Sequence, residues 1–104
     1  MASSKAYLEY VLEQLSELSD VKYRPMMGEY IVYYHGKVIG GIYDDRLLVK
    51  RTESLKTLLP NAPLQMPYEG GKEMVLIEDL EDKELLAEIF KVLYDEIPSK
   101  NGGK

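Results

Sequence analysis

The sequence of 104 residues contains no cysteine, no tryptophan, one phenylalanine and one histidine. Without cysteine there is no disulfide, no thiolate metal ligand and no thiol nucleophile. The one histidine, His35, cannot build a zinc site of several histidines, and we assign it no role. These absences exclude many metal proteins and thiol enzymes before any pattern is considered.

Long apolar runs are also missing. No segment approaches the run of about 18 apolar residues that a membrane-spanning helix needs, and no signal-peptide pattern opens the chain. We therefore expect no membrane insertion and a cytoplasmic location, which the lack of cysteine also favours. The glycine spacing of a phosphate-binding loop, the acid spacing of an EF-hand and a Gly-x-Ser-x-Gly element are all absent. With no recognisable pair of nucleophile and base, we expect no enzyme activity, no catalytic residues, no metal and no cofactor.

The net charge is −5 at pH 7, but it is unevenly distributed. Residues 21–58 hold seven bases and four acids, whereas the segments on either side are acidic. The bases Lys37, Lys50, Arg51 and Lys56 are interpreted as solubilising residues. A DNA-binding domain typically carries a concentrated basic face on a basic chain, so we expect no direct nucleic-acid binding.

The apolar pattern predicts one α+β domain over residues 1–98, followed by a disordered tail over 99–104. Helical spacing of apolar residues near both ends, and short apolar runs between turns, predict two layers: an antiparallel sheet packed by N- and C-terminal helices. Pro25 places the first strand at an edge of the sheet or makes it short, because proline cannot donate to a ladder. The first predicted helix begins at Ser3 or Ser4 and ends at Ser19. The second runs from Thr52 or Ser54 to Leu58, and the third begins at Asp79 or Asp82 and ends before Pro98. The predicted strands are 21–27, 29–34, 37–43, 46–50 and 72–78.

The strand over 29–34 has apolar residues on both faces. Tyr30, Val32 and Tyr34 alternate with Ile31 and Tyr33, whereas a sheet with one wet face should alternate apolar and polar residues. The central strands therefore carry more apolar area than the predicted helices can cover. We expect another molecule to cover the remainder.

The next strand repeats this pattern. Val38 and Ile42 are predicted on one side, opposed by Ile39 and Tyr43. The pair Gly40-Gly41 inside this strand indicates a bulge or a close approach by another backbone or side chain.

Nine tyrosines against one phenylalanine are typical of an interface, because tyrosine combines apolar area with a polar tip, and equally of strands, where tyrosine is common. We expect a non-enzymatic regulatory or protein-interaction module, a homodimer that associates through its sheet or its edge strand. The predicted interaction surface consists of Arg24, Met27, Gly28, Tyr30, Tyr33, Tyr43 and Tyr68. The alternative is a small-molecule-binding domain with a pocket between the sheet and the loop over 60–72, suggested by Leu64, Met66 and Tyr68.

Several short motifs resemble the N-terminal domain of the TfoX/Sxy competence-regulator family, in order and spacing, over roughly residues 4–97. They are Arg24-Pro-Met-Met-Gly28, Tyr33, the His35-Gly36-Lys37 turn, Asp44-Asp45-Arg46-Leu47, Val49-Lys50 and Met66-Pro67-Tyr68. The resemblance implies an α+β fold similar to secretion chaperones, and a bacterial cytoplasmic protein. It also implies transcriptional control, because full-length members are coactivators of DNA-uptake genes that work with the cyclic-AMP receptor protein.

Two departures from the family pattern bear on function. Met27 stands where the family usually has an aromatic residue, and Glu29 stands where it usually has glycine, so the turn chemistry differs. The full-length regulators also carry a C-terminal helical domain that these 104 residues do not include. The family's N-terminal domain has no catalytic residues, and the resemblance assigns none here.

Overall fold

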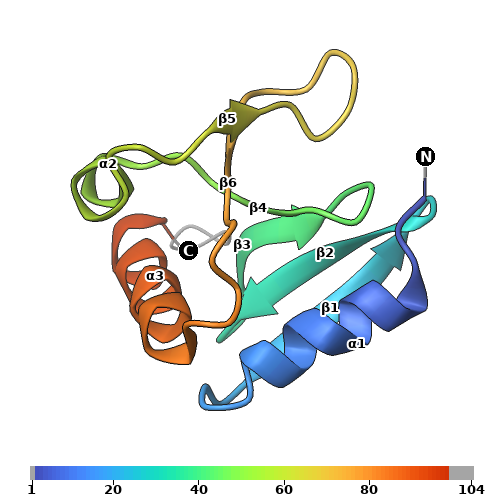
Figure 1. The fold of residues 1–104 in the computed structure, drawn as a ribbon, viewed down its shortest axis with the longest axis horizontal. Helices are drawn as coiled ribbons and strands as arrows, with labels where there is room; N and C mark the ends of the chain where they lie inside the picture. The colour runs from blue at the N-terminus through green and yellow to red at the C-terminus, as the bar shows by residue number, and fades with distance from the viewer. Residues whose placement is uncertain (1, 99–104) are drawn as a thin grey trace.

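The structure, a computed structural model that describes residues 2–98, contains three helices and six strands within that range (Figure 1). The tail predicted over 99–104 lies outside the described residues. The elements are α1 (Lys5–Gln14), β1 (Val21–Met26), β2 (Glu29–Tyr34), β3 (Lys37–Ile42), β4 (Leu47–Val49), α2 (Glu53–Leu58), β5 (Leu64–Gln65), β6 (Met74–Leu76) and α3 (Lys83–Glu96).

The strands form one sheet in the order β1-β2-β3-β4-β6-β5, and every neighbouring pair is antiparallel. The predicted α+β architecture, with an antiparallel sheet packed by N- and C-terminal helices, is confirmed. β1 lies at an edge, as Pro25 predicted. The other edge strand, β5, was not predicted, because its two residues lie between Pro63 and Pro67 in a segment interpreted as loop.

Three two-residue turns connect the first four strands. Both central residues of each turn have positive φ: Met27-Gly28, His35-Gly36 and Asp44-Asp45. Such turns match the right-handed twist of the strands that they join. The turns predicted at His35-Gly36 and Asp44-Asp45 are therefore confirmed, and the first turn projects Met27, whose exposed fraction is 96%.

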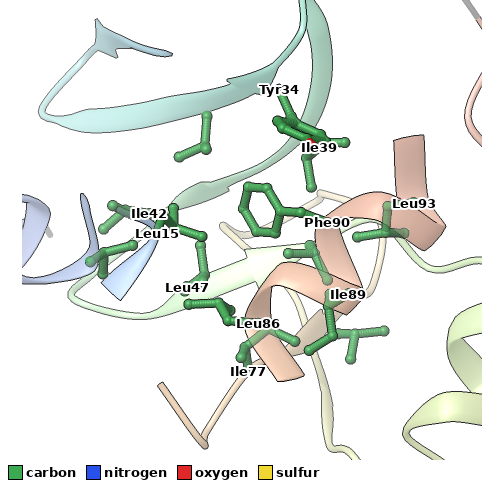
Figure 2. Close-up of a cluster of buried hydrophobic side chains, with 14 of the residues drawn as sticks. Leu15, Tyr34, Ile39, Ile42, Leu47, Ile77, Leu86, Ile89, Phe90 and Leu93 are labelled. Carbon is green, nitrogen blue, oxygen red and sulfur yellow. The ribbon is translucent and has the colours of Figure 1, made fainter. Parts of the chain in front are cut away.

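The helices begin with side-chain caps and pack on one face of the sheet. Ser4, Thr52 and Asp82 each accept a hydrogen bond from a backbone N–H in the first turn of their helix. α1 ends at Gln14, earlier than predicted, and the partly buried Leu18 contacts the core from the following turn. Figure 2 shows Phe90 of α3 at the centre of this core, where its ring lies edge-on to Tyr34 at 6.0 Å.

The predicted alternation in β3 is wrong at Val38 and Ile39, because Val38 faces away from Ile42 and Ile39 lies on the side of Ile42. Val32 pairs with Gly40 and Tyr33 pairs with Val38, so that Ile39 is an extra residue in a β-bulge. The bulge turns Ile39 toward the helices, where it joins Ile42 in the core instead of opposing it. The bulge predicted from Gly40-Gly41 is confirmed, and so is the close approach: a Cβ on Gly40 would lie 2.1 Å from the carbonyl oxygen of Leu48.

A buried serine joins the start of α1 to two turns. Ser3 is 8% exposed, donates from Oγ to Glu29 Oε1 at 2.6 Å and accepts from the N–H of Asp45 at 3.0 Å. Asp45 in turn accepts from the N–H of Ser4 at 2.9 Å, and Glu29 accepts from the N–H of Asp44 at 3.0 Å. This network fixes α1 against the corner where the β1–β2 and β3–β4 turns meet.

The end of α3 also holds the start of α2, and this contact predicts a pH dependence. Glu96 Oε1 accepts from the backbone N–H of Ser54 at 3.0 Å, and this hydrogen bond lowers the pKa of Glu96 from its ordinary value of 4.5. The contact therefore stabilises the fold above that ordinary pKa and is lost as the pH falls through the lower, folded-state value. We expect Glu96→Gln to lower the melting temperature slightly at neutral pH and to have no effect well below pH 4.5.

The control for this prediction is Glu88→Gln, on the exposed side of the same helix. It should leave the melting temperature unchanged at both pH values. A deficit in Glu96→Gln that is equally large at both pH values would contradict the assignment.

Candidate functional site

The face of the sheet opposite the helices is the first candidate site. All three helices within residues 2–98 place their buried side chains in the core on the other face. The strand register puts one continuous row of residues on the face without a helix, because paired residues point to the same side. The row crosses five strands, from Arg24 through Ile31, Gly41 and Leu48 to Leu76. We call this surface the open face.

The open face has apolar residues that are only partly covered. Ile31 and Leu76 of the row are half-buried, as are Tyr33 and Val38 beside it, whereas Leu48 of the row is fully buried. The apolar pattern predicted on both faces of β2 is therefore present: Val32 and Tyr34 enter the helix-packed core, while Ile31 and Tyr33 face the other way.

The seven residues predicted as an interaction surface do not form one patch. Arg24 and Tyr33 line the same shallow depression of about 600 Å³ on the open face. Tyr43 and Tyr68 lie in contact further along the sheet, with ring centroids 6.1 Å apart. The remaining three lie elsewhere: Tyr30 packs against the core on the helix side, and Met27 and Gly28 form the β1–β2 turn.

The free edge of the sheet at β1 is poorly suited to adding another strand. His35 donates its backbone N–H to the carbonyl of Asp20 at 3.0 Å, and hydrogen-bonded pairs alternate along an antiparallel ladder. The backbone groups of Asp20, and of every second residue after it, therefore point toward β2. Those of the residues in between point toward the free edge; these are Val21, Tyr23 and Pro25, and Pro25 has no N–H to donate. Of the two association modes expected from the sequence, this geometry favours the face over the edge strand.

A loop from residue 66 to 73 overhangs the far end of the open face. The ring of Tyr43 lies across Gly41, where an added Cβ would approach ring atoms to 2.7 Å, and the loop residue Tyr68 packs edge-on against it. Figure 1 shows this loop, between β5 and β6, projecting away from α1 and α3.

Two arginines fix the ends of the loop. Arg46 donates from Nη1 to Gln65 Oε1 at 2.7 Å, and from Nε to the carbonyl of Tyr43 at 3.0 Å. At the other end, Arg51 Nη1 lies 3.4 Å from Glu73 Oε1. The loop therefore has a defined position over the sheet.

A hollow of about 920 Å³ lies beneath this loop, which is the place predicted for a small-molecule pocket. Tyr68 lines it as expected, but Leu64 and Met66 do not. Its other walls include Tyr43, Lys50 and Lys72. Burial raises the pKa of Tyr43, and the nearby Tyr68 and Glu29 raise it further, so its hydroxyl stays neutral at physiological pH. We call this space the loop hollow.

Sequence reasoning missed the basic character of the loop hollow. Lys50 and Arg51 were interpreted as solubilising residues, and Lys72 was assigned no role, yet all three line the same space. They come together because β4 pairs with β6, and nothing in the sequence identified that pairing. Lys37 was also interpreted as solubilising, but its Nζ donates to the carbonyls of Tyr94 and Ile97 at the end of α3.

Two further findings concern the described residues as a whole. Within residues 2–98 there is no group of three or more His, Cys, Asp or Glu side chains placed to hold a metal ion. Over the same range, each helix is too short or too polar to cross a membrane.

Comparison with known proteins gives two matches. The model of the TfoX N-terminal domain family matches residues 13–95. An uncharacterised 12.7 kDa protein from the trpE 5′ region of Spirochaeta aurantia is 31% identical over 80 residues, which cover 77% of this chain and 70% of that protein. The matched range includes every strand of the sheet and all but the last residue of α3.

Proposed function

Because this chain belongs to the TfoX N-terminal domain family, we propose that it is a non-enzymatic regulatory module that binds an acidic protein partner through its open face. The observation that carries the proposal is the row that crosses five strands, in which Ile31 and Leu76 are half-buried and no helix within residues 2–98 covers them. A cytoplasmic location and a part in regulating competence genes, both implied by the family resemblance, belong to the same proposal.

The charge on the open face favours an acidic partner over a second copy of the chain. Arg24 of the row and Lys22 on the same face lie beside Tyr33. Lys22 Nζ lies 3.8 Å from Asp20 Oδ1, whereas Arg24 makes no ion pair within residues 2–98. An acidic partner would complement these bases, and charge complementarity across an interface speeds and directs association. The homodimer expected from the sequence is therefore the competing hypothesis.

The proposal can be tested by photo-crosslinking at chosen tyrosines. A photoreactive phenylalanine analogue at position 33 should capture the partner in native cells, while the same analogue at position 10, an exposed tyrosine of α1, should not. With the captured protein purified, we expect Arg24→Glu and Tyr33→Ser each to weaken binding by about tenfold or more, with Tyr10→Ser as the matched control. Binding should also weaken with added salt.

Two outcomes would contradict this proposal. One is equal capture of the same protein from positions 33 and 10. The other is capture of the chain by itself, together with a light-scattering mass of twice 11.9 kDa that Tyr33→Ser returns to a single chain.

A further inference from the structure

The loop hollow lies at the far end of the open face, and neither Arg24 nor Tyr33 lines it. We propose that it binds a nucleoside phosphate, with the phosphate held by the bases of the hollow and the planar ring stacked on Tyr68. Bases line the hollow, two tyrosines form one wall, and its volume is that of a small-molecule site.

The first element is unneutralised positive charge. Lys50, Arg51 and Lys72 line the hollow together with one acid, Glu73. Within residues 2–98, neither Lys50 nor Lys72 has a carboxylate oxygen within 4.0 Å of its Nζ, and Arg51 has only the exposed Glu73 at 3.4 Å. In a chain of net charge −5, this local excess of positive charge favours an anionic ligand, and lysine and arginine are the usual partners of phosphate.

The second element is an aromatic surface in a fixed position. Tyr68 is 59% exposed, while the ring that it packs against, Tyr43, is only 6% exposed. Gly71 permits this arrangement, because a Cβ there would lie 3.0 Å from a ring carbon of Tyr68. The exposed Tyr68 ring therefore stands beside the bases with its edge anchored. Stacking of a base on such a ring contributes about 1–3 kcal/mol.

The third element is size and fixed walls. A volume of about 920 Å³ falls within the 300–1,000 Å³ that is typical of small-molecule sites. The hydrogen bond from Arg46 to Gln65 anchors the start of the loop, and at its end the half-exposed Arg51 lies 3.4 Å from Glu73. A mononucleotide matches the size of this hollow, whereas an overall negative chain disfavours the many phosphates of a nucleic-acid strand.

The test is a titration of the ¹⁵N-labelled chain with ADP, followed by amide chemical shifts. We expect saturable shifts confined to residue 50 and residues 68–73, with a dissociation constant below about 1 mM. Adenosine alone and pyrophosphate alone should each bind about tenfold more weakly than ADP, because each supplies half of the contacts. Lys72→Glu and Tyr68→Ala should each weaken ADP binding by at least about tenfold, while Lys91→Glu, an exposed lysine of α3, should not.

Several results would overturn the inference. Shifts that do not saturate, or that lie on the helices, would remove the site. Pyrophosphate binding as tightly as ADP would show a bare anion site with no ring contact. Tighter binding of a short thymidine oligonucleotide than of ADP would show a nucleic-acid surface instead. Because Tyr33 and Arg24 lie outside the loop hollow, their variants should bind ADP normally, so failure of the partner proposal would leave this one standing.

Discussion

Gly40→Ala is expected to lower the free energy of unfolding by at least about 3 kcal/mol, the upper range for overpacking in a core. A Cβ at this position would lie 2.1 Å from the carbonyl oxygen of Leu48 and 2.7 Å from the Cα of Val49. Both obstructing atoms belong to the backbone of β4, so no side-chain rotation can relieve the overlap. β4 would have to move away from β3, in the middle of the sheet. Urea denaturation followed by circular dichroism measures the change.

The matched control for this prediction is Gly36→Ala in the β2–β3 turn. Gly36 has a φ of +82°, and nothing lies within 4 Å of an added Cβ. That substitution tests backbone strain without steric overlap, and it should cost about 1 kcal/mol. If Gly40→Ala destabilised the protein no more than Gly36→Ala does, the close approach of β3 and β4 would be wrong.

Lys37→Met is expected to lower the free energy of unfolding by about 2 kcal/mol. The Lys37 Nζ donates to the carbonyl of Tyr94 at 2.8 Å and to that of Ile97 at 2.7 Å, and it lies 4.0 Å from the centroid of the Tyr94 ring. The last turn of α3 contains no base of its own, so this lysine from β3 supplies the positive charge that the carbonyl end of a helix favours. Methionine preserves the length and apolar stem of the side chain but removes every one of these contacts.

Lys91→Met provides the comparison, because Lys91 is an exposed lysine of α3 itself. We expect it to change stability by no more than about 0.5 kcal/mol. Equal effects from the two substitutions would mean that Lys37 acts only through the general charge of the protein. A shift of the α3 amide signals near residue 94 in Lys37→Met alone would support the assigned contact.

The sequence predicted the elements because their patterns are local. Apolar spacing and capping residues located the three helices found between residues 2 and 98, and glycine and aspartate turns located the first hairpins. It did not predict the side to which Ile39 points, because one bulged residue reverses the alternation on which that assignment depends. It missed β5 because a strand of two residues has no periodicity to detect.

The candidate sites were less predictable than the fold for a related reason. Arg24 and Tyr33 were identified from a sequence pattern, and the register confirms only that they lie on the same face. The loop hollow depends on the pairing of β4 with β6, which brings Lys72 and Lys50 together across 22 positions of the chain. Long-range pairing of this kind has no counterpart in local periodicity, and without it the bases appear only as dispersed surface charges.

The most direct test of the account is methyl cross-saturation from the bound partner, once photo-crosslinking has identified it. Irradiating the partner should reduce the methyl signals of Ile31, Val38 and Leu76, which are the half-buried aliphatic residues of the open face. Methyl groups of Leu12 and Val92, on the helices of the opposite layer, should keep their intensity. Loss of signal at Leu12 and Val92 with none at Ile31 would contradict the claim that the open face is where this protein meets its partner.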